Sequence, residues 1–208
     1  MIAGIDEAGR GPLIGPLVVA LCACPDPQKL VQLGVADSKH FGSGPRARHV
    51  RARLCRDIMA QSRVFWVQIE AHIIDEFVLS GVGLNVLERQ AALRLLQHCG
   101  PVREVYADGK TLFSPLQIRF SHLHAQDKAD VQYPVVAAAS IVAKTLRDLW
   151  MERYEKHMAS IGFPLSGGGY PNAATMDFVK RWKSTFGDLP PHVRTSWRCS
   201  SYTIGNLF

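Results

Sequence analysis

Short apolar runs alternate along the chain with segments of helical periodicity. The two clearest runs, residues 2–5 and 17–24, are almost continuously apolar, which predicts strands buried on both faces of a sheet. Gly4 lies inside the first run and predicts that another part of the chain comes close to this strand. Two Gly-Pro pairs between the runs predict a tight connection and an antiparallel pairing. Further strands are predicted at residues 64–69, 102–107 and 116–120.

Outside these runs, apolar residues recur at every third or fourth position. This spacing predicts helices at residues 46–61, 73–79, 84–99, 133–158 and 173–186. Strands and helices alternate without an internal repeat and without a linker long enough to separate two domains. We therefore expect one α/β domain over residues 1–208.

Composition narrows the class of protein. Apolar residues make up 47% of the chain, which is typical of a globular protein with a sizeable core. No apolar run approaches the roughly 20 residues that a membrane helix requires. Because the first predicted strand begins at residue 2, we also expect no secretory leader. We therefore expect a cytoplasmic protein without a membrane partner. The five cysteines are odd in number and scattered, which predicts free, buried thiols rather than a zinc site.

Acidic residues end two of the predicted strands and precede one of the predicted helices. Asp6 and Glu7 end the first strand, Asp108 ends a later one, and Asp130 lies just before a helix. Carboxylates that cluster at strand ends repel each other and lose hydration, and a divalent cation relieves both costs. Oxygen ligands suit Mg²⁺ or Mn²⁺, and four acids are enough to hold two such ions. The alternative is that these acids are ordinary, solvated strand ends.

Two loops carry residues that are suited to contacting phosphate. Gly9 and Gly11 flank Arg10, so the backbone can come close to a ligand while the guanidinium supplies charge. Ser38 and Lys39 belong to a polar loop that either contacts phosphate or is simply solvated. The net charge of +6 is compatible with a polyanionic partner, although many basic proteins have none.

A glycine triplet precedes Tyr170, which indicates either a ring that stacks on a sugar or base, or a loop packed by its own tyrosine. The helix at residues 46–61 carries five arginines, which either face a phosphate backbone or are solvated. The sequence contains no Walker A or dinucleotide-binding glycine pattern. Hydrolysis of a nucleic-acid backbone at an all-oxygen metal site accounts for most of these features.

Taken together, the motifs resemble those of ribonuclease HII. The similarity follows the chain in order from residue 2 to about residue 198. The matching motifs are residues 5–12, 37–39, 107–109, 128–130, 133–144, 147–148 and 169–171. The resemblance implies a ribonuclease H-like mixed five-stranded sheet flanked by helices, with roughly residues 160–208 as a helical C-terminal extension.

The resemblance also implies an activity and a set of site residues. The activity is two-metal hydrolysis of the RNA strand of RNA–DNA hybrids, with nicks 5′ to single ribonucleotides embedded in duplex DNA. We expect the enzyme to be a monomer. The implied metal ligands are Asp6, Glu7, Asp108 and Asp130. The implied substrate contacts are Gly9, Arg10 and Gly11 at the 2′-hydroxyl and scissile phosphate, Tyr170 at the junction sugar, and Ser38, Lys39 and Lys144 near the phosphate backbone.

Some positions depart from the family pattern and leave alternatives open. Gln132 stands where family members often carry a lysine, and Asp127 could replace Asp130 as the fourth acid. Residues 38–43 resemble the ribonuclease HIII branch about as well, so a preference for long RNA tracts is a second hypothesis. A third is a nucleic-acid-binding domain without activity, although four intact acids argue against a pure binder of phosphate.

Overall fold

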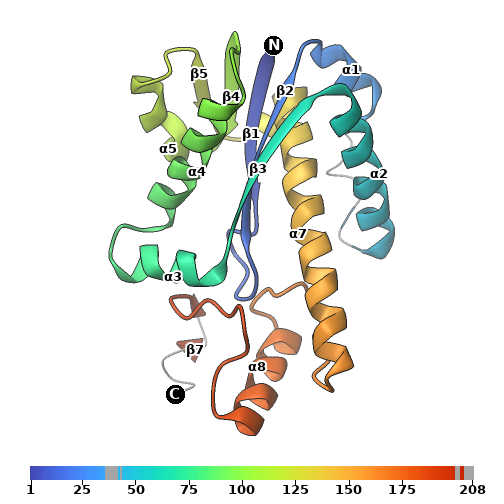
Figure 1. Ribbon diagram of the computed structural model, residues 1–208, viewed down its shortest axis with the longest axis vertical. Coiled ribbons are helices and arrows are strands. Elements are labelled where there is room, and N and C mark those ends of the chain that lie inside the picture. Colours follow the sequence, from blue (N-terminus) through green and yellow to red (C-terminus); the bar gives the residue numbers. More distant parts are fainter. Residues whose placement is uncertain (36–41, 43, 200–201, 204–208) are drawn as a thin grey trace. The chain divides into compact units, whose positions relative to one another are not determined.

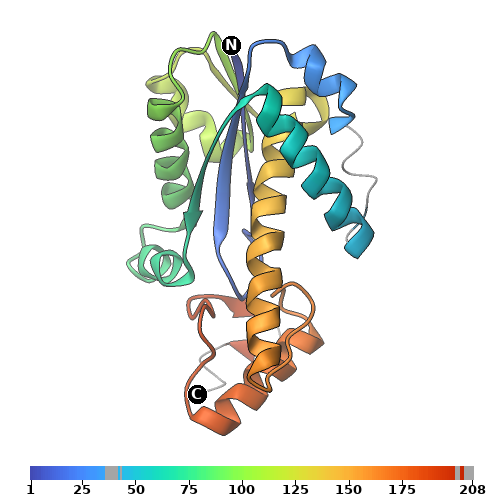
Figure 2. The same ribbon diagram turned by 45° about the vertical axis from the view of Figure 1, so that its right-hand side comes forward.

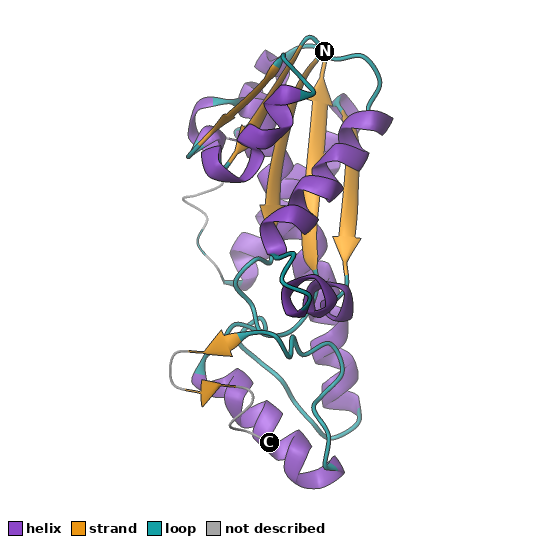
Figure 3. Cartoon of the chain, turned by 90° about the vertical axis from the view of Figure 1, so that its left-hand side faces the viewer, coloured by secondary structure: helices purple, strands orange, loops and turns teal. Residues whose placement is uncertain are grey.

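A five-stranded mixed sheet forms the centre of the fold. The computed structural model describes residues 1–35, 42, 44–199 and 202–203 (Figure 1). The strands are β1 (Ile2–Ala8), β2 (Leu17–Cys24), β3 (Arg63–Ile69), β4 (Glu104–Asp108) and β5 (Leu123–Gln126). They lie in the order β3-β2-β1-β4-β5 and are drawn in orange in Figure 3. β1 pairs antiparallel with β2 and parallel with β4, which in turn pairs parallel with β5. The predicted mixed sheet and the antiparallel pairing of its first two strands are therefore confirmed.

The strand predicted at residues 116–120 is wrong. A 3-10 helix, η2 (Ser114–Ile118), occupies this region, with a proline in its first turn. Ile118 is 93% exposed, so the apolar residues of this run do not all belong to the core. The strand lies a few residues later, where Leu123 is buried and pairs with Val105 of β4. His124 belongs to this strand.

Eight α-helices lie in the described residues, and their positions confirm the five predicted helices to within a few residues at each end. The helices are α1 (Pro27–Gln32), α2 (Pro45–Gln61), α3 (Ala71–Leu79), α4 (Leu84–His98), α5 (Lys110–Phe113), α6 (Ala129–Gln132), α7 (Pro134–Ser160) and α8 (Ala173–Phe186). Two short strands, β6 (Arg198–Cys199) and β7 (Tyr202–Thr203), pair near the C-terminus. In the described part of the chain, no helix is both long enough and apolar enough to cross a membrane.

The chain divides into two compact units. The first comprises residues 1–8, 18–68 and 85–146, and the second comprises residues 9–17, 69–84 and 147–208. A single domain with residues 160–208 as its extension stays a prediction.

In the first unit, helices cover both faces of the sheet. The first half of α7 and helix α2 pack on one face of β1 and β2, through buried residues such as Val136, Ile58 and Ala20. Helix α4 lies on the opposite side of the sheet from α2 and α7 (Figures 1 and 2). Cys22, Cys24, Cys55 and Cys99 are free and buried in this unit, as predicted.

Gly4 of β1 permits close contact between the sheet and α7. A methyl group on Gly4 would lie 2.2 Å from the carbonyl carbon of Val135 and 2.3 Å from the amide nitrogen of Val136. Backbone atoms therefore occupy the space that any other residue's side chain needs, which confirms the predicted close approach. This contact holds the beginning of α7 directly against β1.

The second unit has its own core. Leu13 and Ile14 pack with Met151 of α7 and with Phe178 and Val179 of α8. The side chain of Asn172 caps α8 by accepting a hydrogen bond from the Thr175 amide. The last helix ends at Gly187, whose φ of 82° gives the left-handed conformation typical of this position.

Candidate metal centre and substrate loop

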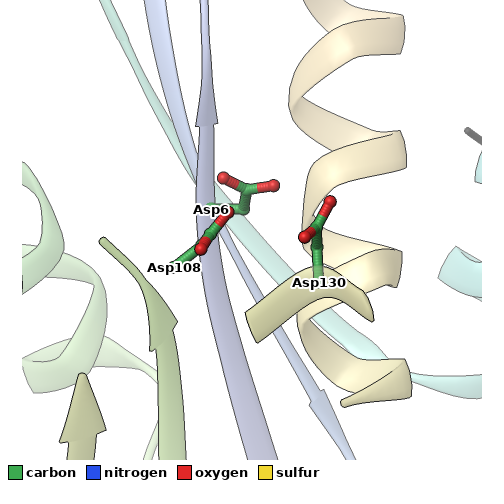
Figure 4. Close-up of side chains that lie close together, drawn as sticks. All are labelled: Asp6, Asp108 and Asp130. Carbon is green, nitrogen blue, oxygen red and sulfur yellow. The ribbon is translucent and has the colours of Figure 1, made fainter. Parts of the chain in front are cut away.

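Three of the four predicted carboxylates converge at the ends of neighbouring strands. Asp6 lies near the end of β1, Asp108 is the last residue of β4, and Asp130 belongs to α6. One carboxylate oxygen of each lies within 4.8 Å of the corresponding oxygens of the other two. Figure 4 shows the three side chains gathered beside β1 and near α7. The three acids therefore lie close together, as expected for Asp6 and Asp108 from the ends of their parallel strands.

Local backbone geometry explains how each aspartate reaches this position. β1 and β4 are parallel neighbours, so Asp6 and Asp108 lie at the same end of the sheet. The Ala129 amide donates to Oδ1 of Asp108 over 3.0 Å, which connects β4 to the turn before α6. Lys128 in that turn has a φ of 60°, an unusual conformation for a residue other than glycine. This sharp turn directs the chain so that Asp130 reaches the other two acids.

The environment of Asp6 disfavours its charged form. Its side chain is buried, and desolvation raises its pKa from 3.8 to about 6, with a further contribution from the nearby charge of Asp108. The hydroxyl of Ser140, the Glu7 amide and the charge of Lys144 oppose this rise in pKa. The Glu7 amide donates to Oδ1 of Asp6 over 2.8 Å. A cation bound beside this carboxylate would favour its charged form and lower its pKa again.

The donor atoms of this cluster fit a hard divalent cation. All three ligand groups are carboxylates, the ligand type preferred by Mg²⁺ and Mn²⁺. A cation here would offset both the mutual repulsion of the acids and the desolvation of Asp6. We therefore treat Asp6, Asp108 and Asp130 as a candidate metal centre.

The other acids that the sequence offered are placed differently. Glu7 follows Asp6 on β1 and does not belong to the group of three oxygens. Asp127, the alternative to Asp130, accepts a hydrogen bond from the Lys110 amide over 2.8 Å and is also outside the group. The geometry therefore favours Asp130 over Asp127 as the acid that joins Asp6 and Asp108.

Two of the other polar residues that the sequence singled out lie in the described part of the first unit. Gln132, which stands in the place of the usual lysine, accepts a hydrogen bond from Nε2 of Gln126 over 2.8 Å. Lys144 is exposed on α7, and its charge lowers the pKa of Asp6. Ser38 and Lys39 lie outside the described residues.

We expect the stability of the metal-free protein to fall as the pH rises from about 4 to about 6. The pKa of Asp6 is raised on folding, so the native state binds the proton more tightly than the unfolded state does across this range. The free energy that folding loses by burying a charged Asp6 is absent below about pH 4. It is fully present above about pH 6, where it is on the order of 3 kcal/mol. Urea unfolding in EDTA at several pH values measures this cost.

The matched variant is Asp6→Asn, which cannot ionise. We expect it to lose this part of the pH dependence and to be more stable than the wild type in EDTA at pH 8. Mn²⁺ should raise the melting temperature of the wild type clearly and that of the variant only slightly. Equal pH dependence in the two proteins would contradict the description of Asp6.

The second unit brings together the other group of predicted substrate residues. Gly9, Arg10 and Gly11 follow β1, and a methyl group on Gly11 would lie 4.0 Å from Cε1 of Tyr170. The Gly169 carbonyl accepts hydrogen bonds from the amides of Leu13 and Ile14, so the two loops are joined by backbone contacts. Arg10 and Tyr170 are exposed. Gly11 and Tyr170 are therefore exposed neighbours within this unit, whereas Gly9 is buried.

Arg147 supports the loop that carries Tyr170. Its guanidinium donates to the Gly168 carbonyl over 2.8 Å and lies 5.3 Å from the centre of the Tyr170 ring. Gly9 leaves space for this side chain, because a methyl group there would lie 2.7 Å from Cδ of Arg147. Arg147 thus helps to hold the ring next to the loop that contains Gly9.

Sequence reasoning assigned no role to Asp75 and Arg194. Both are charged residues that the structure buries. The apolar neighbours of Asp75 in α3 were a signal that this acid is not on a solvated face. No comparable signal pointed from Arg194 to the loop at residues 9–15, because its partners there are backbone carbonyls.

Comparisons with known proteins place this geometry in context. The family model described as Ribonuclease HII matches residues 3–200. Ribonuclease HII of Methanothermobacter thermautotrophicus is 38% identical over 205 residues, covering 94% of this chain and 95% of that protein. The structure of the PCNA:RNase HII complex from Archaeoglobus fulgidus contains a chain that is 32% identical, with a TM-score of 0.82 and coverage of 99% and 98% of the two chains.

A more distant structure shares the fold. Bst-RNase HIII, solved in complex with Mn²⁺, is 21% identical to this chain, with a TM-score of 0.77. The alignment covers 99% of this chain and 68% of that one. At this level of identity the likeness concerns the fold alone.

Proposed function

The chain belongs to the ribonuclease HII family and is a metal-dependent ribonuclease that acts on RNA–DNA hybrids, and we propose that it also nicks duplex DNA 5′ to a single embedded ribonucleotide. The observation that carries the proposal is the cluster of Asp6, Asp108 and Asp130 at the strand ends. We further propose that the enzyme works as a monomer in the cytoplasm, and light scattering checks the monomer.

In this proposal, the four acids predicted from the sequence hold two ions of Mg²⁺ or Mn²⁺. Asp6, Asp108 and Asp130 supply the oxygens that already lie together, and Glu7 supplies another from the next position on β1. When bound, the ions would activate the attacking water and stabilise the charge on the leaving oxygen. The low dielectric around Asp6 strengthens its attraction for a cation compared with an exposed carboxylate.

The loop of Gly9, Arg10 and Gly11 is proposed to recognise the ribonucleotide. The exposed Gly11 has no side chain that would keep the backbone from the 2′-hydroxyl, and the exposed side chain of Arg10 can pair with a phosphate. Tyr170 lies next to Gly11 and is proposed to stack on the sugar at the junction between RNA and DNA. Ser38, Lys39 and Lys144 are proposed to contact the phosphate backbone.

The decisive experiment uses a DNA duplex that contains one ribonucleotide, incubated with Mg²⁺ and mapped at nucleotide resolution. We expect a single nick 5′ to the ribonucleotide and no cut in the all-DNA duplex of the same sequence. Cleavage of a long RNA–DNA hybrid alone would replace the proposal with a preference for long RNA tracts. If neither substrate is cut with Mg²⁺ or with Mn²⁺, the assignment of the metal centre is wrong and a binding domain becomes the better description.

Tyr170→Ala should reduce kcat/KM more on the single-ribonucleotide duplex than on a long hybrid. A long hybrid offers many equivalent positions, whereas the single ribonucleotide depends on correct recognition of one junction. Loss of one stacking contact is worth about 1–3 kcal/mol, so we expect a loss of about 5-fold to 150-fold on the single-ribonucleotide duplex. Tyr170→Phe keeps the ring and is the matched control. Equal losses on both substrates would remove the junction role of Tyr170.

A further inference from the structure

A buried arginine holds the loop that follows β1. Arg194 is completely buried, and its guanidinium donates to the carbonyls of Gly9 over 2.6 Å, Arg10 over 3.2 Å and Gly15 over 2.8 Å. Its own amide donates to the Leu13 carbonyl over 2.8 Å. A single side chain thus contacts both ends of the turn between residues 9 and 15.

These contacts fix the direction of two backbone amides. In a trans peptide, the carbonyl of one residue and the N–H of the next point in opposite directions. The described residues contain no cis peptide bond. Because the carbonyls of Gly9 and Arg10 point towards Arg194, the amides of Arg10 and Gly11 point away from it. Arg10 and Gly11 are themselves exposed at the surface of the unit.

Trp197 completes the set of contacts on this side of the loop. Its indole nitrogen donates to the Gly11 carbonyl over 3.2 Å, and its ring lies 4.8 Å from the guanidinium carbon of Arg194. The residue after Gly11 is Pro12, which has no N–H to orient. The three consecutive carbonyls from Gly9 to Gly11 therefore accept hydrogen bonds from Arg194 or Trp197. The amides of Arg10 and Gly11, which belong to the same peptide groups, face the other way.

Asp75 in turn holds the segment that carries Arg194. Its carboxylate accepts four hydrogen bonds of 2.6–2.9 Å, from the amides and the hydroxyls of Thr195 and Ser196. Asp75 lies on α3 and is buried, so these bonds are protected from water. Asp75 thereby fixes the two residues that follow Arg194, although it lies 119 residues before Arg194 in the sequence.

From these contacts we infer that Asp75 and Arg194 are positioning residues that aim the amides of Arg10 and Gly11 at the substrate. Two adjacent N–H donors next to an exposed arginine suit a group rich in oxygen, such as a ribose 2′-hydroxyl beside a phosphate. The inference rests on the proposed recognition of a ribonucleotide by this loop. It assigns the accuracy of that recognition to two residues that do not touch the substrate.

The test compares variants that differ in how they hold the loop. Arg194→Gln removes the charge and most of the donors, and Arg194→Lys keeps the charge. Asp75→Asn removes the acceptor of two of the four bonds and leaves an uncharged acceptor for the other two. The matched control is Arg181→Gln, because Arg181 lies in the same unit and donates to the Pro164 carbonyl away from this loop. Each variant is first compared with the wild type by circular dichroism and melting temperature.

The measured quantity is the preference for the duplex with one ribonucleotide over the all-DNA duplex. A smaller fraction of folded protein does not change this ratio. Dissociation constants are measured for the single-ribonucleotide duplex and the matching all-DNA duplex, with every variant also carrying Asp6→Asn to prevent cleavage. Misplacing a binding group by about 1 Å can cost about 100-fold, so we expect Arg194→Gln and Asp75→Asn to lower the ratio of the two constants by about 10-fold or more. Arg194→Lys should retain part of the preference, and Arg181→Gln all of it. In cleavage assays with Asp6 intact, KM for the single-ribonucleotide duplex should rise more than kcat falls.

The outcomes separate the inference from the proposed function. If the wild type fails to nick the single-ribonucleotide duplex, the proposed function itself is wrong. If the wild type nicks it and the folded Arg194→Gln and Asp75→Asn proteins keep the full preference, only the positioning role is wrong. Should Arg194→Gln fail to fold, Arg194→Lys and Asp75→Asn decide the question by the same ratio.

Discussion

Asp6→Asn should lower the rate of cleavage by about a thousandfold or more while leaving the affinity for a ribonucleotide-containing duplex within a few-fold of the wild type. Asp6 is the most buried member of the cluster, and its pKa is raised by that burial. An uncharged amide in this position contributes far less to holding a divalent cation. Loss of about 4 kcal/mol of transition-state stabilisation corresponds to a thousandfold lower rate. Single-turnover cleavage and fluorescence anisotropy measure the two quantities.

Asp127→Asn is the matched control for this prediction. It is the same substitution in the same part of the first unit, but its carboxylate bonds to the Lys110 amide and lies outside the cluster. We expect this variant to cleave at nearly the wild-type rate. Undiminished cleavage by Asp6→Asn would refute the metal centre. Equal damage from both substitutions would give Asp127 a part in it.

Gly4→Ala should destabilise the first unit and cause a large loss of activity. The added methyl group would lie 2.2 Å from a backbone carbon of α7, and backbone cannot move aside as a flexible side chain can. Overpacking of this kind costs about 3 kcal/mol or more, because β1 and α7 must separate. A shift of about 1 Å at this contact would also move Asp6 on β1 relative to Ser140 on α7, with a loss of about 100-fold in kcat/KM.

Urea unfolding and cleavage assays test this prediction together. Gly44→Ala is the control, because a methyl group there meets no atom within 4 Å and its φ of −75° suits alanine. We expect Gly44→Ala to unfold at nearly the wild-type urea concentration. A Gly4→Ala protein as stable and as active as the control would mean that β1 and α7 do not pack as closely as described.

The fold could be predicted from the sequence where burial and periodicity agree. The run at residues 17–24 is completely buried in β2, and α8 has the predicted limits because a capping asparagine and a final glycine mark its ends. The prediction failed at residues 116–120, where apolar residues do not all enter the core. Strand β5 has only four residues, which are too few for an alternation of apolar and polar positions to distinguish it from a loop.

The candidate site was predictable to the extent that it depends on where strands end. Asp6 and Asp108 were found in this way, since parallel neighbours bring their ends together. The choice between Asp127 and Asp130 was not predictable, because it depends on the left-handed turn at Lys128. Arg194 was missed for a different reason. Its partners are backbone carbonyls, which have the same chemistry at every residue and leave no pattern in the sequence.

The buried thiols of the first unit have a practical consequence for studies of this protein. Burial raises the pKa of Cys22 to about 12, and its side chain is inaccessible in the folded state. The reactive thiolate therefore forms only when the unit opens and the residue meets water. Alkylation of Cys22 under native conditions should be slow, and its rate would report how often this part of the chain unfolds. The protein thus carries its own probe of local opening, without an added label.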